Sequence, residues 1–253
     1  MSRAWLNPAG GIRYHARGFR YAERLWAPFR WHLGEWLYDW DPPEKKLVLV
    51  GPSAGWCIQP FFFERFDEVL CLEPDPLAHF LFRRRLARAP LDARPRLRFE
   101  ATDQLLEDPS RFGALLEREG PAAVLFSNIV GQVRVLLGTA DADEPAFTAV
   151  REAVQHALRG RSWASFHDRV SGDPEPDLPA VYVSDARLDD AEIIELFYPV
   201  LEGRPARAID RRGRRELLDH LTADFFPPER PHCYFSWQLL PGQFHLVEAT
   251  RSA

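Results

Sequence analysis

Short apolar runs alternate with amphipathic segments along most of the chain. The runs are typical of strands buried inside a sheet, and they cover residues 47–50, 69–72, 97–100, 122–127 and 162–166. Segments whose apolar residues recur at helical spacing lie mostly between or after them, and the clearest cover residues 76–88, 110–119, 145–159, 190–202 and 211–221. Strands that alternate with helices predict a mostly parallel sheet with helices on both faces.

The two ends of the chain follow other patterns. Residues 1–43 carry aromatic side chains at helical spacing, which predicts one or two amphipathic helices, broken near Pro28, that cover the sheet. We therefore expect an N-terminal helical segment, 1–43, and a sheet domain, 44–253. Near the C-terminus, residues 234–239 and 243–247 flank Pro241-Gly242, as in an antiparallel hairpin. The pattern as a whole predicts a doubly wound α/β fold, with a mostly parallel seven-stranded sheet that ends in this hairpin.

Composition narrows the class of protein without naming a function. The 253 residues are 46% hydrophobic and 27% charged, which is ordinary for a globular protein. The formal charge of −5 gives no global attraction for nucleic acid, and no apolar stretch is long enough for a membrane span. Met1-Ser2-Arg3 does not open a secretion signal, and the odd number of cysteines, none at metal-ligand spacing, indicates reduced thiols: Cys57, Cys71 and Cys233. We expect a cytoplasmic protein without a metal site.

A glycine-rich turn after the first apolar run carries the strongest chemical signal. Residues 46–50 lead into Gly51-Pro52-Ser53-Ala54-Gly55, and the second run ends in Glu73-Pro74-Asp75. Glu73 follows Gly51 by 22 positions, near the spacing of about 20 expected for one strand–helix–strand unit. In doubly wound sheets such a turn lets backbone N–H groups approach a ligand, and the acid accepts hydrogen bonds from ribose hydroxyls. The spacing predicts a site for a nucleoside-bearing cofactor.

Five helix-linked strands, the turn and the hairpin together resemble the class I S-adenosylmethionine-dependent methyltransferases over roughly residues 45–249. Gly51, Ser53 and Gly55 occupy the three glycine places of that family's first motif, with serine in the middle one. Leu49 stands where the family usually has an acid. The resemblance implies a seven-stranded sheet with one reversed strand near an edge, and S-adenosylmethionine as cofactor.

The resemblance also assigns roles to later residues. Glu73 matches the ribose-binding acid, which Asp75 would reinforce, and Thr102-Asp103 follows the third strand, where the family contacts adenine. We expect the fourth strand, residues 122–127, to lead into a loop, and polar residues leave the fourth and fifth strands over the same crevice. The cofactor-binding set that it implies is Gly51, Ser53, Gly55, Glu73, Asp75, Thr102, Asp103 and Ser127, and the catalytic set is Asn128, His167 and Asp168.

Methyl transfer to a small molecule, a peptide or a protein is therefore the expected activity. His167 or Asp168 would act as a base where the acceptor must lose a proton, and Asn128 would orient it. The departures at Leu49 and Ser53 leave open a non-catalytic scaffold that binds a protein partner.

Two further alternatives use the same turn. Gly51 to Gly55 also reads as Gly-x-Ser-x-Gly, the nucleophile elbow of serine hydrolases, with Ser53 as nucleophile. A nicotinamide dinucleotide site would need glycine at Ser53 and at Trp56, so that pattern fails twice.

Overall fold

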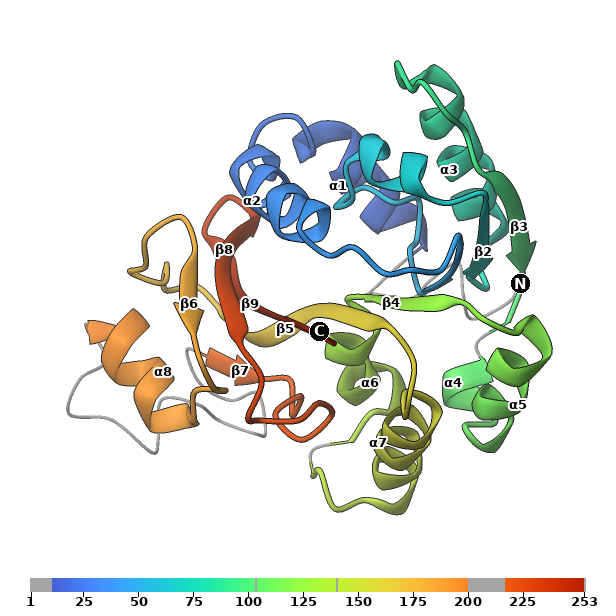
Figure 1. The fold of residues 1–253 in the computed structure, drawn as a ribbon. Helices are drawn as coiled ribbons and strands as arrows, with labels where there is room; N and C mark the ends of the chain where they lie inside the picture. Colours follow the sequence, from blue (N-terminus) through green and yellow to red (C-terminus); the bar gives the residue numbers. More distant parts are fainter. Residues whose placement is uncertain (1–10, 103, 140, 200–216, 253) are drawn as a thin grey trace.

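Nine strands form one sheet in the computed structural model, which describes residues 11–102, 104–139, 141–199 and 217–252 (Figure 1). The strand order is β3-β2-β1-β4-β5-β9-β8-β6, and β7 pairs with β5 beside this path. The strands are β1 (Lys46–Val50), β2 (Glu68–Leu72), β3 (Arg96–Glu100), β4 (Ala123–Ser127), β5 (Trp163–Gly172), β6 (Tyr182–Ser184), β7 (Leu217–Asp219), β8 (His232–Leu240) and β9 (Gln243–Arg251).

The predicted architecture is confirmed. Strands β1 to β5 are parallel and follow the order 3-2-1-4-5 of doubly wound sheets. Strand β9 runs antiparallel between β5 and β8, so the C-terminal hairpin supplies the reversed strand. These seven strands are the expected ones, and the short strands β6 and β7 extend the sheet beyond them.

Two local predictions are wrong. A helix was expected over residues 211–221, but Leu217–Asp219 is strand β7, which pairs with the last residues of β5; residues 211–216 lie outside the described chain. The long β5 creates this difference, because its end reaches Gly172 and offers backbone groups to a further strand. After β4 a loop was expected, whereas helix α6 begins at Ile129, directly after Asn128.

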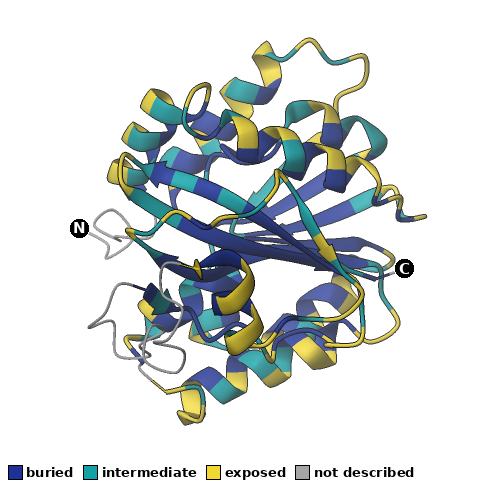
Figure 2. Cartoon of the chain, turned by 90° about the vertical axis from the view of Figure 1, so that its left-hand side faces the viewer, coloured by how far each residue is buried: buried dark blue, intermediate teal, exposed yellow. Residues whose placement is uncertain are grey.

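Helices cover both faces of the sheet, and the strands between them are mostly buried (Figures 1 and 2). One face carries α1 (Gly11–Tyr21), α2 (Ala27–Tyr38), the 3-10 helix η2 (Pro60–Arg65) and α3 (Pro76–Arg88). The other carries α4 (Gln104–Glu107), α5 (Ser110–Glu119), α6 (Ile129–Leu137) and α7 (Pro145–Ala157), and α8 (Asp190–Phe197) packs near β6. No helix of the described segments has the length and apolar character that crossing a bilayer requires.

Side chains of β1 alternate between the two cores. Leu47 and Leu49 belong to the core under α1 and α2, whereas Val48 and Val50 belong to the core under α5 to α7. Leu49, at the place of the motif acid, is fully buried among apolar residues. A carboxylate there would lose its hydration without a partner, which explains why this chain has leucine.

The N-terminal helices share one apolar core with the hairpin. The indole Nε1 of Trp26 donates a hydrogen bond to the carbonyl of Leu239 at 3.0 Å, and Phe29 stacks on Trp237 with ring centroids 5.1 Å apart. Trp26 is 0% exposed. The division of the chain into residues 1–43 and 44–253 thus stays a prediction, and the N-terminal helices pack directly on the sheet domain.

Replacing Trp26 with alanine should lower the free energy of unfolding by about 3–5 kcal/mol, the usual cost of removing a large buried aromatic side chain. Trp31 of the neighbouring helix is 60% exposed and serves as the control, and Trp31→Ala should change the value by less than about 0.5 kcal/mol. Urea unfolding followed by circular dichroism measures both. Equal losses for the two variants would contradict the packing described.

Candidate functional site

A cavity of about 270 Å³ lies at the carboxyl ends of the parallel strands. The turn after β1, Glu73 after β2 and Ser127 of β4 line it, together with Asp168 of β5. This is where ligands bind in open α/β sheets. Helix α1 and the hairpin complete the wall with Gly11, Tyr14 and Arg17 on one side and Trp237, Leu239, Gln243 and His245 on the other.

The glycine turn has the predicted sharp geometry. Gly51, Ser53 and Gly55 have φ values of 65°, 50° and 66°, all in the left-handed region. A Cβ on Gly51 would lie 2.7 Å from the Cβ of Ile129, so the close approach of α6 also requires glycine there. Gly51 and Ser53 line the cavity, whereas Gly55 packs against the ring of Phe82.

The carboxylate of Glu73 points toward this turn. Its Oε2 accepts a hydrogen bond from the backbone N–H of Ser53 at 2.8 Å, and its Oε1 accepts one from Asp75 at 3.0 Å. Glu73 is 8% exposed and lines the cavity. A carboxylate has about four acceptor positions, so ordering by backbone groups still leaves it able to accept from a ligand's hydroxyls.

The other residues assigned to the cofactor separate into groups. Ser127 lines the main cavity, and Thr102 lines a small neighbouring pocket of about 20 Å³ together with Gly51. Asp75 lines neither pocket: its Oδ1 caps α3 at the N–H of Leu77, and its Oδ2 lies 2.9 Å from Nε2 of His15, so its part in cofactor binding stays a prediction. Asp103 lies outside the described residues.

Asn128 joins the ends of β4 and β5. Its Oδ1 accepts from the backbone N–H of Asp168 at 2.8 Å, and its Nδ2 donates to Oδ2 of Asp168 at 3.0 Å. Gln132, one turn along α6, donates to the same oxygen at 3.2 Å. Asn128 has a φ of 59°, which asparagine tolerates better than most residues. These contacts make Asn128 a positioning residue for Asp168.

His167 faces away from the cavity, and its assignment as a catalytic base is corrected. Its ring stacks on Phe226 with centroids 5.3 Å apart, and Nδ1 lies 2.9 Å from the hydroxyl of Ser165. Neighbouring residues of a strand point to opposite faces, so only one of His167 and Asp168 can reach the cavity. Asp168 is the one that does.

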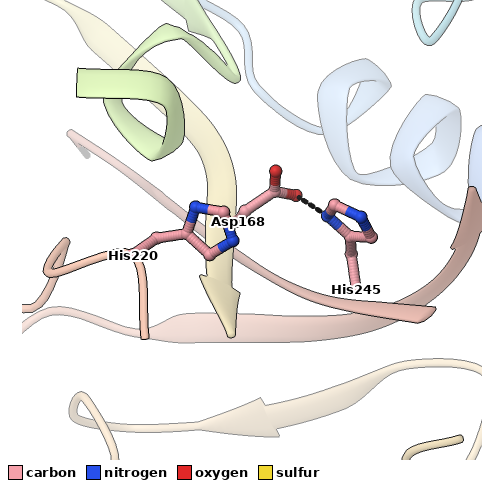
Figure 3. Close-up of side chains that lie close together, drawn as sticks. All are labelled: Asp168, His220 and His245. Atoms are coloured by element: carbon pink, nitrogen blue, oxygen red, sulfur yellow. Dashed lines mark ion pairs between the residues drawn. The ribbon is translucent and has the colours of Figure 1, made fainter. Parts of the chain in front are cut away.

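Two histidines that the sequence did not single out lie beside Asp168 (Figure 3). His245 of β9 places Nδ1 3.0 Å from Oδ1 of Asp168. His220, just after β7, donates from Nδ1 to the carbonyl of Gly131 at 2.7 Å and accepts at Nε2 from Ser171 at 2.9 Å. The alternation of β9 could have placed His245 on the cavity face, but His220 lay in a segment that was predicted to be helical.

Burial and charge set the protonation of this cluster. Loss of hydration at the buried Asp168 carboxyl would raise its pKa, but the neighbouring His245 and His220 and the amide of Asn128 outweigh this and lower the pKa to about 2. Burial lowers the pKa of His220, which keeps its ring neutral. The cluster therefore combines an ionised carboxylate with at least one neutral imidazole.

An apolar wall faces these polar groups. Tyr14, Cys57, Phe166, Trp237 and Leu239 line it. The Tyr14 hydroxyl lies 3.5 Å from Sγ of Cys57. Burial raises the pKa of Tyr14 well above its ordinary value and that of the Cys57 thiol to about 11, so both groups stay neutral near pH 7.

The strand order and the reversed β9 decide the architecture. The chain has the class I methyltransferase fold. No family model and no curated protein matches this methyltransferase-fold chain.

Several solved methyltransferase structures are similar to it, with identities of at most 21% and TM-scores below 0.5. The N-methyltransferase NodS from Bradyrhizobium japonicum WM9, in complex with S-adenosyl-L-homocysteine, is 11% identical with a TM-score of 0.44, and the match covers 93% of this chain and 98% of NodS. The glycopeptide N-methyltransferase MtfA, complexed with S-adenosyl-L-methionine, is 17% identical with a TM-score of 0.37, and the match covers 85% of this chain and 91% of MtfA. CalS10, an amino pentose methyltransferase from Micromonospora echinaspora, is 21% identical with a TM-score of 0.35, and the match covers 67% of this chain and 65% of CalS10.

A methyl group at Gly131 should disturb the site. A Cβ there would lie 2.7 Å from both Oδ1 of Asn128 and the backbone N of Asp168, so Gly131→Ala should cost about 1–3 kcal/mol of unfolding free energy. Gly113 of α5 provides the matched control, because no atom lies within 4 Å of its added Cβ. Gly113→Ala should stabilise the protein by up to about 1 kcal/mol, and urea unfolding tests the opposite signs.

Proposed function

We propose that this protein is an S-adenosylmethionine-dependent methyltransferase. The observation that carries the proposal is the contact between the Glu73 carboxylate and the N–H of Ser53, inside a cavity that continues to Asp168. An acid held against a left-handed turn at the end of β2 is what a ribose needs in such a sheet. Ser53 and Glu73 both line this cavity, and the side chains of the turn do not fill it.

Residues around the cavity would contact each part of this cofactor. Glu73 would accept hydrogen bonds from the ribose hydroxyls. Thr102 and Ile129 line the small pocket that would take the adenine, and Ile129 would have to move to admit the ring. Arg17, the only arginine or lysine among the described residues lining the cavity, would attract the carboxylate of the methionine part.

The reaction would be a displacement at the sulfonium methyl group. A lone pair of the acceptor forms the new bond to the methyl carbon while the carbon–sulfur bond breaks, and its electron pair stays on sulfur. The products are a methylated acceptor, S-adenosylhomocysteine and the proton that the acceptor loses. The protein's main contribution is to hold the nucleophile in line with the methyl group. Asn128 and Gln132 serve this by fixing Asp168.

A small molecule is the acceptor class that the cavity favours. Helix α1 covers the space through Tyr14 and Arg17, and Trp237 and His245 close the hairpin side. A concave site of about 270 Å³ suits a compact acceptor better than a folded protein surface. Aromatic walls with a few polar groups are typical of small-molecule sites.

The serine hydrolase alternative is less well supported. A nucleophile elbow requires a helix directly after the serine, whereas turns and the 3-10 helix η2 follow Ser53. The scaffold alternative is also weaker, because a chain that binds nothing here has no reason to keep Glu73 and Asp168 buried around a cavity.

Titration calorimetry with S-adenosylhomocysteine tests the proposal. Glu73→Gln keeps an oxygen for the N–H of Ser53 but removes the charge, so the Kd should rise by about 10–100-fold, the loss expected for hydrogen bonds to a charged group. Glu117→Gln is the control, since Glu117 is exposed on α5 and does not line the cavity, and its Kd should not change. Absence of binding to the unmodified protein would favour the scaffold alternative.

A further inference from the structure

His245 is a buried side chain whose ring nitrogens lack hydrogen bonds. It is 6% exposed, lines the cavity, and neither Nδ1 nor Nε2 forms a hydrogen bond within the described chain. Nδ1 lies 3.0 Å from Oδ1 of Asp168, where a protonated ring would form an ion pair, and that oxygen accepts no hydrogen bond of standard geometry within the described chain. Buried polar atoms without hydrogen bonds are unfavourable, and a third group that binds both atoms would remove that penalty.

His220 adds a donor with a defined tautomer. The carbonyl of Gly131 can only accept, so Nδ1 of His220 carries the proton and Nε2 carries the lone pair. The hydroxyl of Ser171 donates to that lone pair. A Lewis acid that binds Nε2 would replace only this one hydrogen bond. A backbone carbonyl that orients the imidazole through the opposite nitrogen is the usual support of a metal-binding histidine.

Asp168 is supported in the same way. Asn128 and Gln132 both donate to Oδ2, which turns Oδ1 toward the histidines. Asp168, His220 and His245 each offer one ligand atom, and these atoms all lie within 4.8 Å of one another (Figure 3). Three elements distant in sequence thus bring one carboxylate and two imidazoles to a single point.

We propose that Asp168, His220 and His245 bind a divalent first-row transition ion such as Zn²⁺. Ligands at about 2.1 Å from an ion lie roughly 3.0–3.4 Å from each other, which is the separation already present between Asp168 and His245. The remaining distances, which reach at most 4.8 Å, would have to shorten through side-chain rotation, and Nε2 of His220 would exchange its bond with Ser171 for the ion. One carboxylate with two imidazoles is a donor set for zinc or iron and not for calcium or magnesium, and three protein ligands leave a position open toward the cavity.

The open position gives the ion a place in the proposed reaction. An acceptor oxygen or nitrogen bound there would lose its proton more easily, which makes it a better nucleophile for the methyl group. This role depends on the proposed methyltransferase function, but the binding of the ion does not. The two ideas can therefore fail separately.

Cobalt(II) titration of the full chain, stripped of metal by chelator dialysis, tests the site directly. The unmodified protein should develop visible d–d absorption that saturates at one equivalent and that Zn²⁺ abolishes. Asp168→Asn, His220→Gln and His245→Gln should each lose this absorption. His156→Gln is the control, because His156 is exposed on α7, and its titration should match the unmodified protein.

Gln132→Ala provides a second measurement that leaves all three ligands in place. Loss of its hydrogen bond to Asp168 should weaken Zn²⁺ binding by about 10-fold, and this variant decides the matter if a ligand variant does not fold. No absorption in the unmodified protein, absorption that persists in the ligand variants, or thiolate-to-cobalt bands in the near ultraviolet would overturn the proposal. S-adenosylhomocysteine titrations of the same samples measure cofactor binding separately from metal binding.

Discussion

The hydrogen bond from the Ser53 N–H to the Glu73 carboxylate connects the two halves of the proposed cofactor site. It requires a backbone that turns sharply after β1, which Gly51 and Gly55 permit at positive φ. It also requires β2 to end at the same level as β1. The parallel register ensures this, because it pairs Lys46 with Glu68 at one end and Val50 with Leu72 at the other. The acid is buried and yet borders a cavity, so the turn and the sheet together hold a charge at the place where a ligand can use it.

A second buried carboxylate organises the opposite end of the cavity. Asp168 is 0% exposed, and a lone charge there would cost several kcal/mol, so its partners are a condition of the fold. They are Asn128, directly before α6, Gln132 of α6, and His245 of β9. The reversed strand β9 therefore contributes to the site as well as to the sheet, because it places His245 beside the Asp168 carboxylate.

The sequence predicts what depends on short-range patterns. Apolar runs located β1 to β5, the Pro-Gly turn located the hairpin, and the spacing from Gly51 to Glu73 located the turn and its acid correctly. It fails where tertiary pairing decides. Strand β7 exists because the end of β5 offers it backbone partners, and the choice between His167 and Asp168 depends on which face of β5 borders the cavity.

The histidines illustrate this limit most clearly. Between Asp168 and His220 lie 51 residues of chain, and His245 lies in another strand. No local sequence spacing therefore indicates that these three residues form one cluster. Metal motifs that can be read from sequence place their ligands on one turn or one helix, whereas here the sheet itself performs the assembly. The close approach of α6 to β5 at Gly131, which leaves no room for a Cβ, connects this cluster to the cofactor end: the same helix that supports Asp168 carries Ile129 against Gly51. A displacement of α6 must therefore alter both ends of the cavity together.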